Sequence, residues 1–402
     1  MDDSTVSSLY TISARLVDRV PVSFHRYLYD IINWDNWLIA IKGARGVGKT
    51  TMLLQRIKNQ FSNNPQQALY VSLDNLWFAT NSLTDLVEYH YTHGGTHIFL
   101  DEIHKYPNWQ TVIKNIADSY PDLHIVFTGS SMLKIDYSQA DLSRRLRDYT
   151  LFGMSFREFL QFEGEASIKA ITLQELLSEH VRHAMQITSG LKILPLFETY
   201  VKHGYYPFYK READGFEYRL QHVVRVILNE DVPSIEDISY PTILKLQKML
   251  MILSERVPQT PKMNELYTIL ETNREQGMRM MNMLQKAALL NLLSTKAKEF
   301  RHLAKPDKIY LQNTNLMNAL TNRVDTGTMR ETFFMSTLSP VAKLHYPDKG
   351  DFIVDNRYLF EVGGPNKHFD QIKDLPDSFL AVDNTEIGNG NRIPLWLFGF
   401  LY

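Results

Sequence analysis

The sequence predicts an α/β fold, a doubly wound parallel sheet with helices on both faces. Three observations predict it. A glycine-rich loop at 43–48 separates a short apolar run from a stretch with helical spacing. A second apolar run, 97–100, ends in two acids, and apolar runs alternate with amphipathic stretches from 37 to about 155. This alternation is typical of strands and helices wound into one parallel sheet.

Composition narrows the classes of protein. The 402 residues suggest about two to four domains, and 44% hydrophobic with 22% charged residues is typical of a globular chain. The net charge of −2 produces no global field for nucleic acid, so any basic surface is local. The absence of cysteine excludes disulfides and cysteine-bound zinc. With no apolar run of 18 residues and an acidic start, we expect a cytoplasmic protein without a membrane span or signal core.

The glycine-rich loop fits the phosphate-binding pattern G-x-x-x-x-G-K-[ST]. Backbone N–H groups of such a loop curl around a polyphosphate, and the following helix adds its positive end. Lys49 is expected to reach the β- and γ-phosphates, and the Thr50 hydroxyl to ligate Mg²⁺. A chance match in a glycine-containing turn is the alternative, but the strand before and the helix after the loop argue against it. The expected nucleotide-binding residues are Gly43, Ala44, Arg45, Gly46, Val47, Gly48, Lys49, Thr50 and Thr51.

The second apolar run, His97-Ile98-Phe99-Leu100, ends in Asp101 and Glu102, a Walker B pattern. Asp101 is expected to hold the Mg²⁺ shell through water, and Glu102 to orient and activate the attacking water. Two solvated turn acids are the alternative, which the loop upstream argues against. Together the two motifs predict hydrolysis of ATP or GTP with Mg²⁺, without indicating what the hydrolysis drives.

Two further positions are candidates for catalysis. The run 123–127 ends in small polar residues, where Ser130, beside Thr128 and Ser131, could sense the γ-phosphate; a simple turn is the alternative. Arginines crowd 144–147, and Arg145 could reach the γ-phosphate of a neighbouring subunit. A solvated basic helix end is the alternative there. If Arg145 acts in trans, the protein is a homo-oligomer.

A set of motifs extends these patterns. G-x-R-x-x-G-K-T-T at 43–51 is followed by F-L-D-E-I-H-K-Y-P-N-W at 99–109, T-G-S-S at 128–131, L-S-R-R-L at 142–146 and M-S-F-R-E-F-L at 154–160. The set resembles a prokaryotic family of AAA+-type ATPases, close to the signal-transduction ATPases with numerous domains. The usual Gly-Arg of that family stands here as Arg144-Arg145. The resemblance implies a helical linker, a winged helix and a degenerate domain of the PD-(D/E)xK nuclease fold after the ATPase domain.

We therefore expect four domains: an ATPase domain at 1–160, a helical linker or lid at 161–240, a winged helix-turn-helix at 241–322 and a nuclease-like domain at 323–402. In the third, helices are expected at 243–256, from Pro261 and at 274–289, then strands at 290–293 and 308–311. From 296 to 308, five basic residues (Lys308 among them) against two acids give a net charge of +3.

A basic wing beside a recognition helix predicts DNA binding. The alternative is a winged helix that only packs within the protein. The expected DNA-binding residues are Arg274, Arg279, Lys296, Lys298, Arg301 and Lys305.

The last domain carries acids where a nuclease of this fold would have them. Asp351 and Glu361 match the two strand positions, and Glu331 on the preceding helix matches the first acid. Gly363 stands where the fold has its lysine, and Lys367 could replace it only if its chain folds back. We predict a degenerate site without cleavage activity.

The predicted function is that of a cytoplasmic ATPase, with ATP and Mg²⁺ as cofactors, coupled to a DNA-binding C-terminal part. By analogy with nuclease folds that resolve Holliday junctions, branched DNA in repair or recombination is the first substrate to test. Two alternatives stay open. One is an ATP-switched signalling or defence protein with a protein partner, and the other is an active DNA nuclease.

Overall fold

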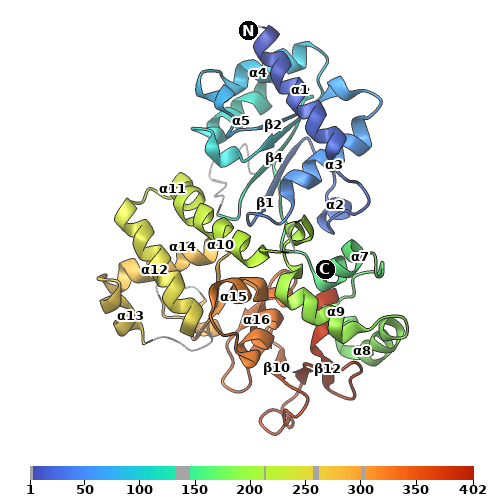
Figure 1. Cartoon of the computed structure of the whole chain (residues 1–402), viewed down its shortest axis with the longest axis vertical. Coiled ribbons are helices and arrows are strands. Elements are labelled where there is room, and N and C mark those ends of the chain that lie inside the picture. The colour runs from blue at the N-terminus through green and yellow to red at the C-terminus, as the bar shows by residue number, and fades with distance from the viewer. Residues whose placement is uncertain (1–2, 133–144, 212–213, 257–261, 300–303) are drawn as a thin grey trace. The chain divides into compact units, whose positions relative to one another are not determined.

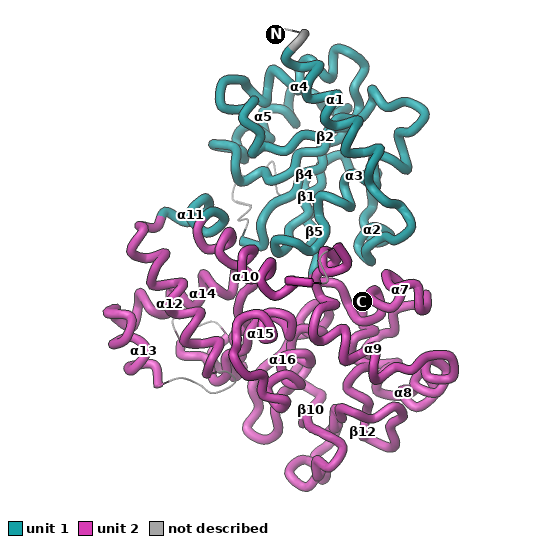
Figure 2. Tube along the Cα trace, in the orientation of Figure 1, with its two compact units in different colours: residues 1–152, 230–237 teal, residues 153–229, 238–402 magenta. Residues whose placement is uncertain are grey.

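The computed structural model of the chain describes residues 3–132, 145–211, 214–256, 262–299 and 304–402 (Figure 1). The chain forms two compact units (Figure 2). The first comprises residues 1–152 and 230–237, and the second 153–229 and 238–402. The chain thus leaves the first unit at 152 and returns to it for one short segment.

The first unit is built on one five-stranded parallel sheet with the order β2-β3-β4-β1-β5. Its strands are β1 (Leu38–Gly43), β2 (Ala68–Ser72), β3 (His97–Asp101), β4 (His124–Ser130) and β5 (Arg147–Thr150). Strand β4 lies between β1 and β3, so the ends of the two motif-bearing strands flank it. Since carboxyl ends of parallel strands share one edge, this edge collects both motifs. The order and parallel direction of these strands fit the AAA+-type P-loop fold, which confirms the predicted fold class.

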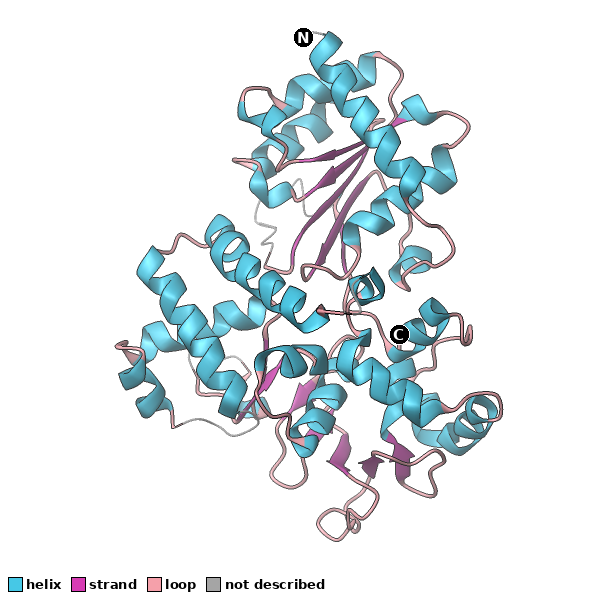
Figure 3. Ribbon diagram, viewed as in Figure 1, coloured by secondary structure: helices cyan, strands magenta, loops and turns pink. Residues whose placement is uncertain are grey.

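Helices cover both faces of this sheet. Helix α3 (Lys49–Phe61) lies on one face, and α4 (Leu83–Thr92) and α5 (Trp109–Ser119) lie on the other (Figure 3). Helix α1 (Asp3–Arg19) packs beside the edge strand β2, where it contacts α3 and, through the 2.7 Å hydrogen bond between Tyr10 and His90, also α4. The strands β1 to β4 are mainly apolar, and β1 is buried from Leu38 to Ile41. The edge strand β5 differs, since it is polar and mostly exposed. The unit is completed by α2 (Leu28–Ile31), η1 (Pro65–Gln67), η2 (Leu76–Ala79), η3 (Ile103–Lys105) and α11 (Val232–Ile235).

The second unit begins with helices whose apolar residues recur three and four apart, as the sequence indicated. They are α7 (Phe156–Glu163), α8 (Leu173–Thr188), α9 (Ile193–Thr199), η4 (Tyr200–Gly204), η5 (Pro207–Arg211) and α10 (Phe216–Val226), and α10 runs on into the π-helical turn η6 (Ile227–Asp231). Capping boxes begin two of them: Ser155 with Glu158 starts α7, and Thr172 with Glu175 starts α8.

Next come α12 (Tyr240–Arg256), α13 (Met263–Ile269) and α14 (Arg274–Lys286), which Asn273 caps by accepting a hydrogen bond from the Gln276 N–H at 2.9 Å. Strands β6 (Leu290–Leu293) and β7 (Lys308–Leu311) then form an antiparallel hairpin, with η7 (Lys296–Lys298) between them, and α15 (Thr314–Leu320) follows. Pro261, the expected start of one helix, lies outside the described residues. Three helices and a hairpin are the order that a winged helix requires, and that assignment stays a prediction.

A second five-stranded sheet, with the order β12-β11-β10-β9-β8, forms the C-terminal α/β region. Strands β8, β9 and β10 are antiparallel, and β10, β11 and β12 are parallel. Its elements are α16 (Thr326–Leu338), β8 (Leu344–His345), β9 (Phe352–Val354), β10 (Tyr358–Gly363), β11 (Ser378–Val382), β12 (Arg392–Pro394) and η8 (Leu395–Phe400). Phe334 of α16 packs against Phe352, Phe360 and Phe398, which fixes the helix on the sheet.

In the part of the chain that the structure describes, no helix combines the length and the apolar character needed to cross a membrane.

Candidate nucleotide site

The glycine-rich loop joins the end of β1 to the start of α3. Gly46 and Gly48 adopt φ values of 87° and 102°, which side chains with a Cβ rarely adopt. A Cβ on Gly43 would lie 2.4 Å from the carbonyl oxygen of Leu151. The motif's glycines are therefore required by the backbone of this loop.

Lys49 opens α3 and is buried, with its Nζ donating to the carbonyl oxygens of Gly43 at 2.8 Å and Ala44 at 3.0 Å. Burial lowers the pKa of Lys49, and the carboxylates of Glu102 and Asp101 oppose that shift. The ammonium thus lies on the loop where phosphates would be bound, with backbone dipoles as its hydrogen-bond partners.

Asp101 ends β3 and accepts hydrogen bonds from three hydroxyls. Its Oδ2 accepts from Thr50 Oγ1 at 2.6 Å and from the Tyr70 hydroxyl at 2.9 Å, and its Oδ1 accepts from Thr128 Oγ1. One carboxylate beside one hydroxyl is an oxygen donor set that fits Mg²⁺, which usually takes few protein ligands plus phosphate and water. Thr50 and Asp101, the residues predicted to hold Mg²⁺, are therefore in contact.

Glu102 lies at the strand tip in a left-handed backbone conformation, φ 55°. Its N–H donates to Thr128 Oγ1 at 3.2 Å, which fixes this unusual backbone. Burial raises the pKa of Glu102, while the Lys49 ammonium lowers it. A carboxylate of raised pKa at the sheet edge has the basicity that a water-activating group needs.

His104 also belongs to this site, although the sequence analysis gave it no role. Its Nε2 lies 3.4 Å from Glu102 Oε2, and burial lowers the pKa of His104 to about 4, so the ring is neutral at pH 7. The sequence signal that could have indicated His104 is its position inside the motif at 99–109, which is more specific to the family that the sequence resembles than the two acids alone.

The structure places Thr128 closer to the acids than Ser130, the preferred sensor candidate. Thr128 is fully buried and bonded to both Asp101 and the Glu102 backbone. Ser130 ends β4 opposite Gly43, and its Oγ accepts from the Met132 N–H at 3.3 Å. Both side chains lie at the correct sheet edge, and the sensor role of Ser130 stays a prediction.

Arg145 forms an exposed ion pair with Asp118, and its guanidinium carbon lies 5.9 Å from the centre of the Trp37 ring. Arg144 and the rest of 133–144 lie outside the described residues. The expected action of Arg145 on a neighbouring subunit stays a prediction.

An ion pair that no motif indicated joins the loop to the returning segment 230–237. Arg45 donates to both carboxylate oxygens of Asp231, with Nε 3.0 Å from Oδ2 and Nη2 2.8 Å from Oδ1. The hydrogen bond to Asp231 raises the pKa of Arg45 further. Asp231 is only 3% exposed. The two residues are 186 positions apart, so local patterns could not reveal the pair.

The predicted nuclease-like acids lie in the second unit among lysines. Lys308 Nζ donates to Glu331 Oε2 at 2.9 Å and to Asp351 Oδ1 at 3.2 Å. The Tyr310 hydroxyl donates to Glu331 at 2.6 Å, and the Val362 N–H to Asp351 at 3.0 Å. The sequence pattern predicted Lys308 as part of the basic wing, but in the structure its ammonium lies between two acids. We call Glu331, Asp351, Glu361, Lys308 and Lys367 the acid–lysine cluster.

Lys367 does fold back onto Glu361, with Nζ 2.8 Å from Oε1. Gly363 permits this path, because a Cβ at 363 would lie 2.5 Å from Lys367 Cγ. Within the described ranges, no group of three or more His, Cys, Asp or Glu side chains is arranged to hold a metal ion. The acids are thus brought near each other with ammonium groups as their cations.

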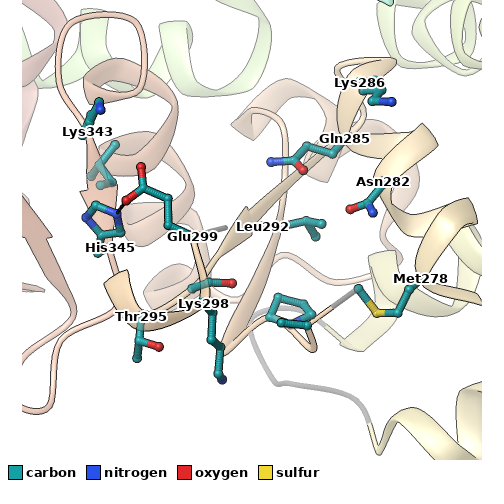
Figure 4. A pocket seen from close by; sticks show the side chains of 14 residues that line it. Met278, Asn282, Gln285, Lys286, Leu292, Thr295, Lys298, Glu299, Lys343 and His345 are labelled. Atoms are coloured by element: carbon teal, nitrogen blue, oxygen red, sulfur yellow. Dashed lines mark ion pairs between the residues drawn. The ribbon is translucent and has the colours of Figure 1, made fainter. Parts of the chain in front are cut away.

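The expected DNA-binding residues are spread over α14 and the hairpin. Arg279 pairs with Glu275 at 2.7 Å and Lys298 with Asp307 at 2.5 Å, while Arg301 lies outside the described residues. Arg274, Lys296 and Lys305 are exposed. A hollow of about 560 Å³ lies between α14, the hairpin and β8, and Lys286, Lys298 and Lys343 line it (Figure 4). Glu299 and His345 line it too, 3.4 Å apart.

Comparisons with known proteins agree with the first unit. Residues 35–160 match the family described as AAA domain, and residues 194–326 match a domain of unknown function, DUF8612. The chain is 25% identical over 425 residues to the uncharacterized protein MJ1637 of Methanocaldococcus jannaschii, covering 94% of this chain and 89% of that protein. The AAA-domain match contains the loop, both acids and Ser130.

Two solved structures are similar in part. The replication initiator DnaA bound to AMPPCP and single-stranded DNA is 10% identical, with 67% of this chain and 90% of that chain covered and a TM-score of 0.31. PCH-2 of C. elegans is 14% identical, with 44% and 48% covered and a TM-score of 0.24. The chain spans about half the length of PCH-2.

Proposed function

We propose that this protein is a cytoplasmic AAA+-type ATPase that hydrolyses ATP with Mg²⁺. The observation that carries the proposal is the 2.6 Å contact between Thr50 of the loop and Asp101 of β3, with Glu102 next in the chain. A hydroxyl and a carboxylate in contact beside a buried lysine form the arrangement that binds a metal-nucleotide complex. Mg²⁺ held by Thr50 and Asp101 would neutralise charge on the transferred phosphate.

The residues of the site divide the chemistry. Loop N–H groups and the Lys49 ammonium bind the phosphates, which fixes the position of the bond to be broken. Glu102 accepts a proton from the attacking water, and its fixed backbone sets the direction of that carboxylate. Thr128 fixes the positions of Asp101 and Glu102, since its hydroxyl donates to the Asp101 carboxylate and accepts from the Glu102 N–H. Arg145 of a neighbouring copy completes the site if the protein is a homo-oligomer.

The test is phosphate release from ATP by the full chain with and without Mg²⁺. Lys49→Ala should abolish hydrolysis and weaken ATP binding, because it removes the loop's only ammonium at the phosphate position. Lys373→Ala, an exposed lysine paired with Asp370 in the second unit, is the matched control and should retain the wild-type rate. Equal rates in wild type and Lys49→Ala would refute the proposal.

We further propose that the second unit binds DNA along α14 and the hairpin, with branched DNA such as a Holliday junction as the first substrate to test. The support is the hollow whose lining includes Lys286, Lys298 and Lys343, each on a different side of it (Figure 4). Cations around a polar hollow can contact successive phosphates. The pairing of Lys298 with Asp307 and of Arg279 with Glu275 means that DNA must displace acids at those positions.

The test is DNA affinity over a range of salt concentrations. Changing Lys286, Lys298 and Lys343 to Gln should lower the log–log salt slope by roughly 2.7, about 0.9 per phosphate contact. Changing Arg182, Lys202 and Lys373 to Gln removes the same charge elsewhere in the unit and should leave the slope unchanged. An unchanged slope in the first variant would make the hairpin a packing module and favour the ATP-switched signalling or defence protein.

For the nuclease-like region we propose a fold without cleavage. The support is Lys308 between Glu331 and Asp351, and Gly363 at the position of the fold's lysine. The full chain should leave duplex, single-stranded and four-way DNA intact in Mg²⁺ or Mn²⁺. Cleavage that disappears on Asp351→Ala would favour the active nuclease and give Lys367 a catalytic role.

A further inference from the structure

The segment 230–237 belongs to the first unit, although the residues on both sides of it in the chain belong to the second. It follows α10, and its Asp231 closes the π-helical turn η6, a geometry often found at functional positions. The segment is therefore joined to the second unit at both of its ends.

The segment contacts both nucleotide motifs. Asp231 binds Arg45 of the loop through two hydrogen bonds. Helix α11 packs against η3, the turn directly after Glu102, and Val232 is fully buried. Glu230 lies 3.9 Å from Lys105 in the same turn. One short segment thus contacts both the loop and the turn after the strand tip.

Asp231 carries a charge of the same sign as the phosphates of a nucleotide. Asp231 is a buried carboxylate whose field reaches both Lys49 and Glu102. A polyphosphate on the loop would place several negative charges near it. In weakly screened surroundings like charges repel strongly, and phosphate oxygens compete for the Arg45 guanidinium, which suits phosphate as well as carboxylate.

We propose that segment 230–237 is a nucleotide-responsive latch: Asp231 holds Arg45 when no nucleotide is bound, and ATP releases the segment by taking over Arg45. This inference rests on the proposed ATPase function and adds its regulation. Release costs the Arg45–Asp231 pair, so the latch lowers ATP affinity. By linkage, ATP lowers the affinity of the segment for the loop by the same factor.

The first experiment measures binding of the non-hydrolysable analogue AMPPCP with Mg²⁺ to the full chain. Asp231→Asn should bind it at least about fivefold more tightly, since coupled sites commonly differ by about 5- to 150-fold. Asp237→Asn makes the same charge change at an exposed position of the segment and should bind like wild type. In an Arg45→Gln background, Asp231→Asn should have much less effect, because the partner is gone.

The second experiment follows amide hydrogen exchange in residues 230–237. Adding AMPPCP should speed exchange there in wild type. Arg45→Lys retains the charge but loses the two-pronged geometry, and it should speed exchange without nucleotide. This variant also tests the latch if Asp231→Asn fails to fold.

The outcomes are distinguishable. If wild type and Asp237→Asn do not bind AMPPCP, the ATPase proposal fails and the latch with it. If both bind it while Asp231→Asn binds equally or more weakly, or exchange in 230–237 does not rise with nucleotide, the latch alone is overturned.

Discussion

Two sites in this chain collect buried or half-buried carboxylates, and they differ in which groups those carboxylates contact. In the first unit Asp101 accepts hydrogen bonds from the hydroxyls of Thr50, Tyr70 and Thr128. In the acid–lysine cluster, Lys308 bridges Glu331 and Asp351, and Lys367 pairs with Glu361. Neutral hydroxyls satisfy Asp101 in the first site, whereas in the second site each of the three acids also has an ammonium partner.

This difference decides what each site can do. A hydroxyl fills a lone pair but leaves the negative charge, so Asp101 can still attract a cation. An ammonium fills the lone pair and cancels the charge, so the cluster needs no metal to be stable. An acid at a motif position is therefore insufficient evidence of a metal site until the charge of its partners is known.

The largest expected effect tests whether the first site hydrolyses ATP. Glu102→Gln should lower ATP hydrolysis by about 10²-fold or more, because it removes the proton acceptor. ATP binding should stay near the wild-type value, since Glu102 acts on water and not on phosphate. Single-turnover hydrolysis and AMPPCP binding measure the two effects. A Glu102→Gln protein that hydrolyses ATP at the wild-type rate would remove this residue from the mechanism.

The pH dependence of hydrolysis gives the next effect. Burial raises the pKa of Glu102 above the ordinary value of 4.5, and only the deprotonated form accepts a proton. The value of kcat/KM should therefore fall about tenfold per pH unit as the pH drops through that raised pKa. The Glu102→Gln variant should lack this acid limb. An acid limb retained by Glu102→Gln would assign the titration to another group.

Removing the ammonium tests the second site. Lys308→Met leaves Glu331 and Asp351 without their shared cation, and breaking a buried pair costs about 3–5 kcal/mol. These side chains are 16–19% exposed, so solvent screening lowers our expectation to about 2 kcal/mol in the free energy of unfolding by urea.

A second change provides the control for Lys308→Met. Adding Glu331→Gln should recover part of the loss, because it removes one unpaired charge. A double variant less stable than Lys308→Met alone would mean that packing, and not charge, is what Lys308 contributes.

The smallest effect comes from a matched pair of tyrosines. Tyr70 donates to Asp101 at 2.9 Å, and Tyr310 donates to Glu331 at 2.6 Å. Each change to Phe removes one hydroxyl from a carboxylate and should cost about 1.5 kcal/mol in unfolding free energy. Only Tyr70→Phe should also change ATP hydrolysis. Equal changes of ATPase in both would break the distinction between the sites.

The first unit could be predicted because its signals are local. Each motif directly follows an apolar run, and parallel strands bring their carboxyl ends to one edge of the sheet. The proximity of Lys49, Thr50, Asp101 and Glu102 can therefore be predicted from local sequence alone. The fold class was confirmed for this reason.

The partners of these residues could not be predicted. Asp231 reaches Arg45 across 186 positions, and Lys308 reaches Asp351 across 43. Periodicity tells which face of a strand a side chain occupies, but not what covers that face. For this reason the sequence predicted Lys308 as part of a basic wing. Ser130 was preferred to Thr128 as the sensor, because nothing in the local sequence shows that the Thr128 hydroxyl lies between Asp101 and the Glu102 backbone.

Gly363 limits which side chains the acid–lysine cluster can accept at this turn. A lysine introduced at 363 would place its Cβ 2.5 Å from Lys367 Cγ, near the base of that side chain, where little adjustment is available. A hydrogen bond fixes the turn that directs Lys367, since the Lys367 N–H donates to the Gly364 carbonyl oxygen at 3.0 Å. A lysine at 363 could therefore join the cluster only together with a change at 367, so these two positions should vary as a pair.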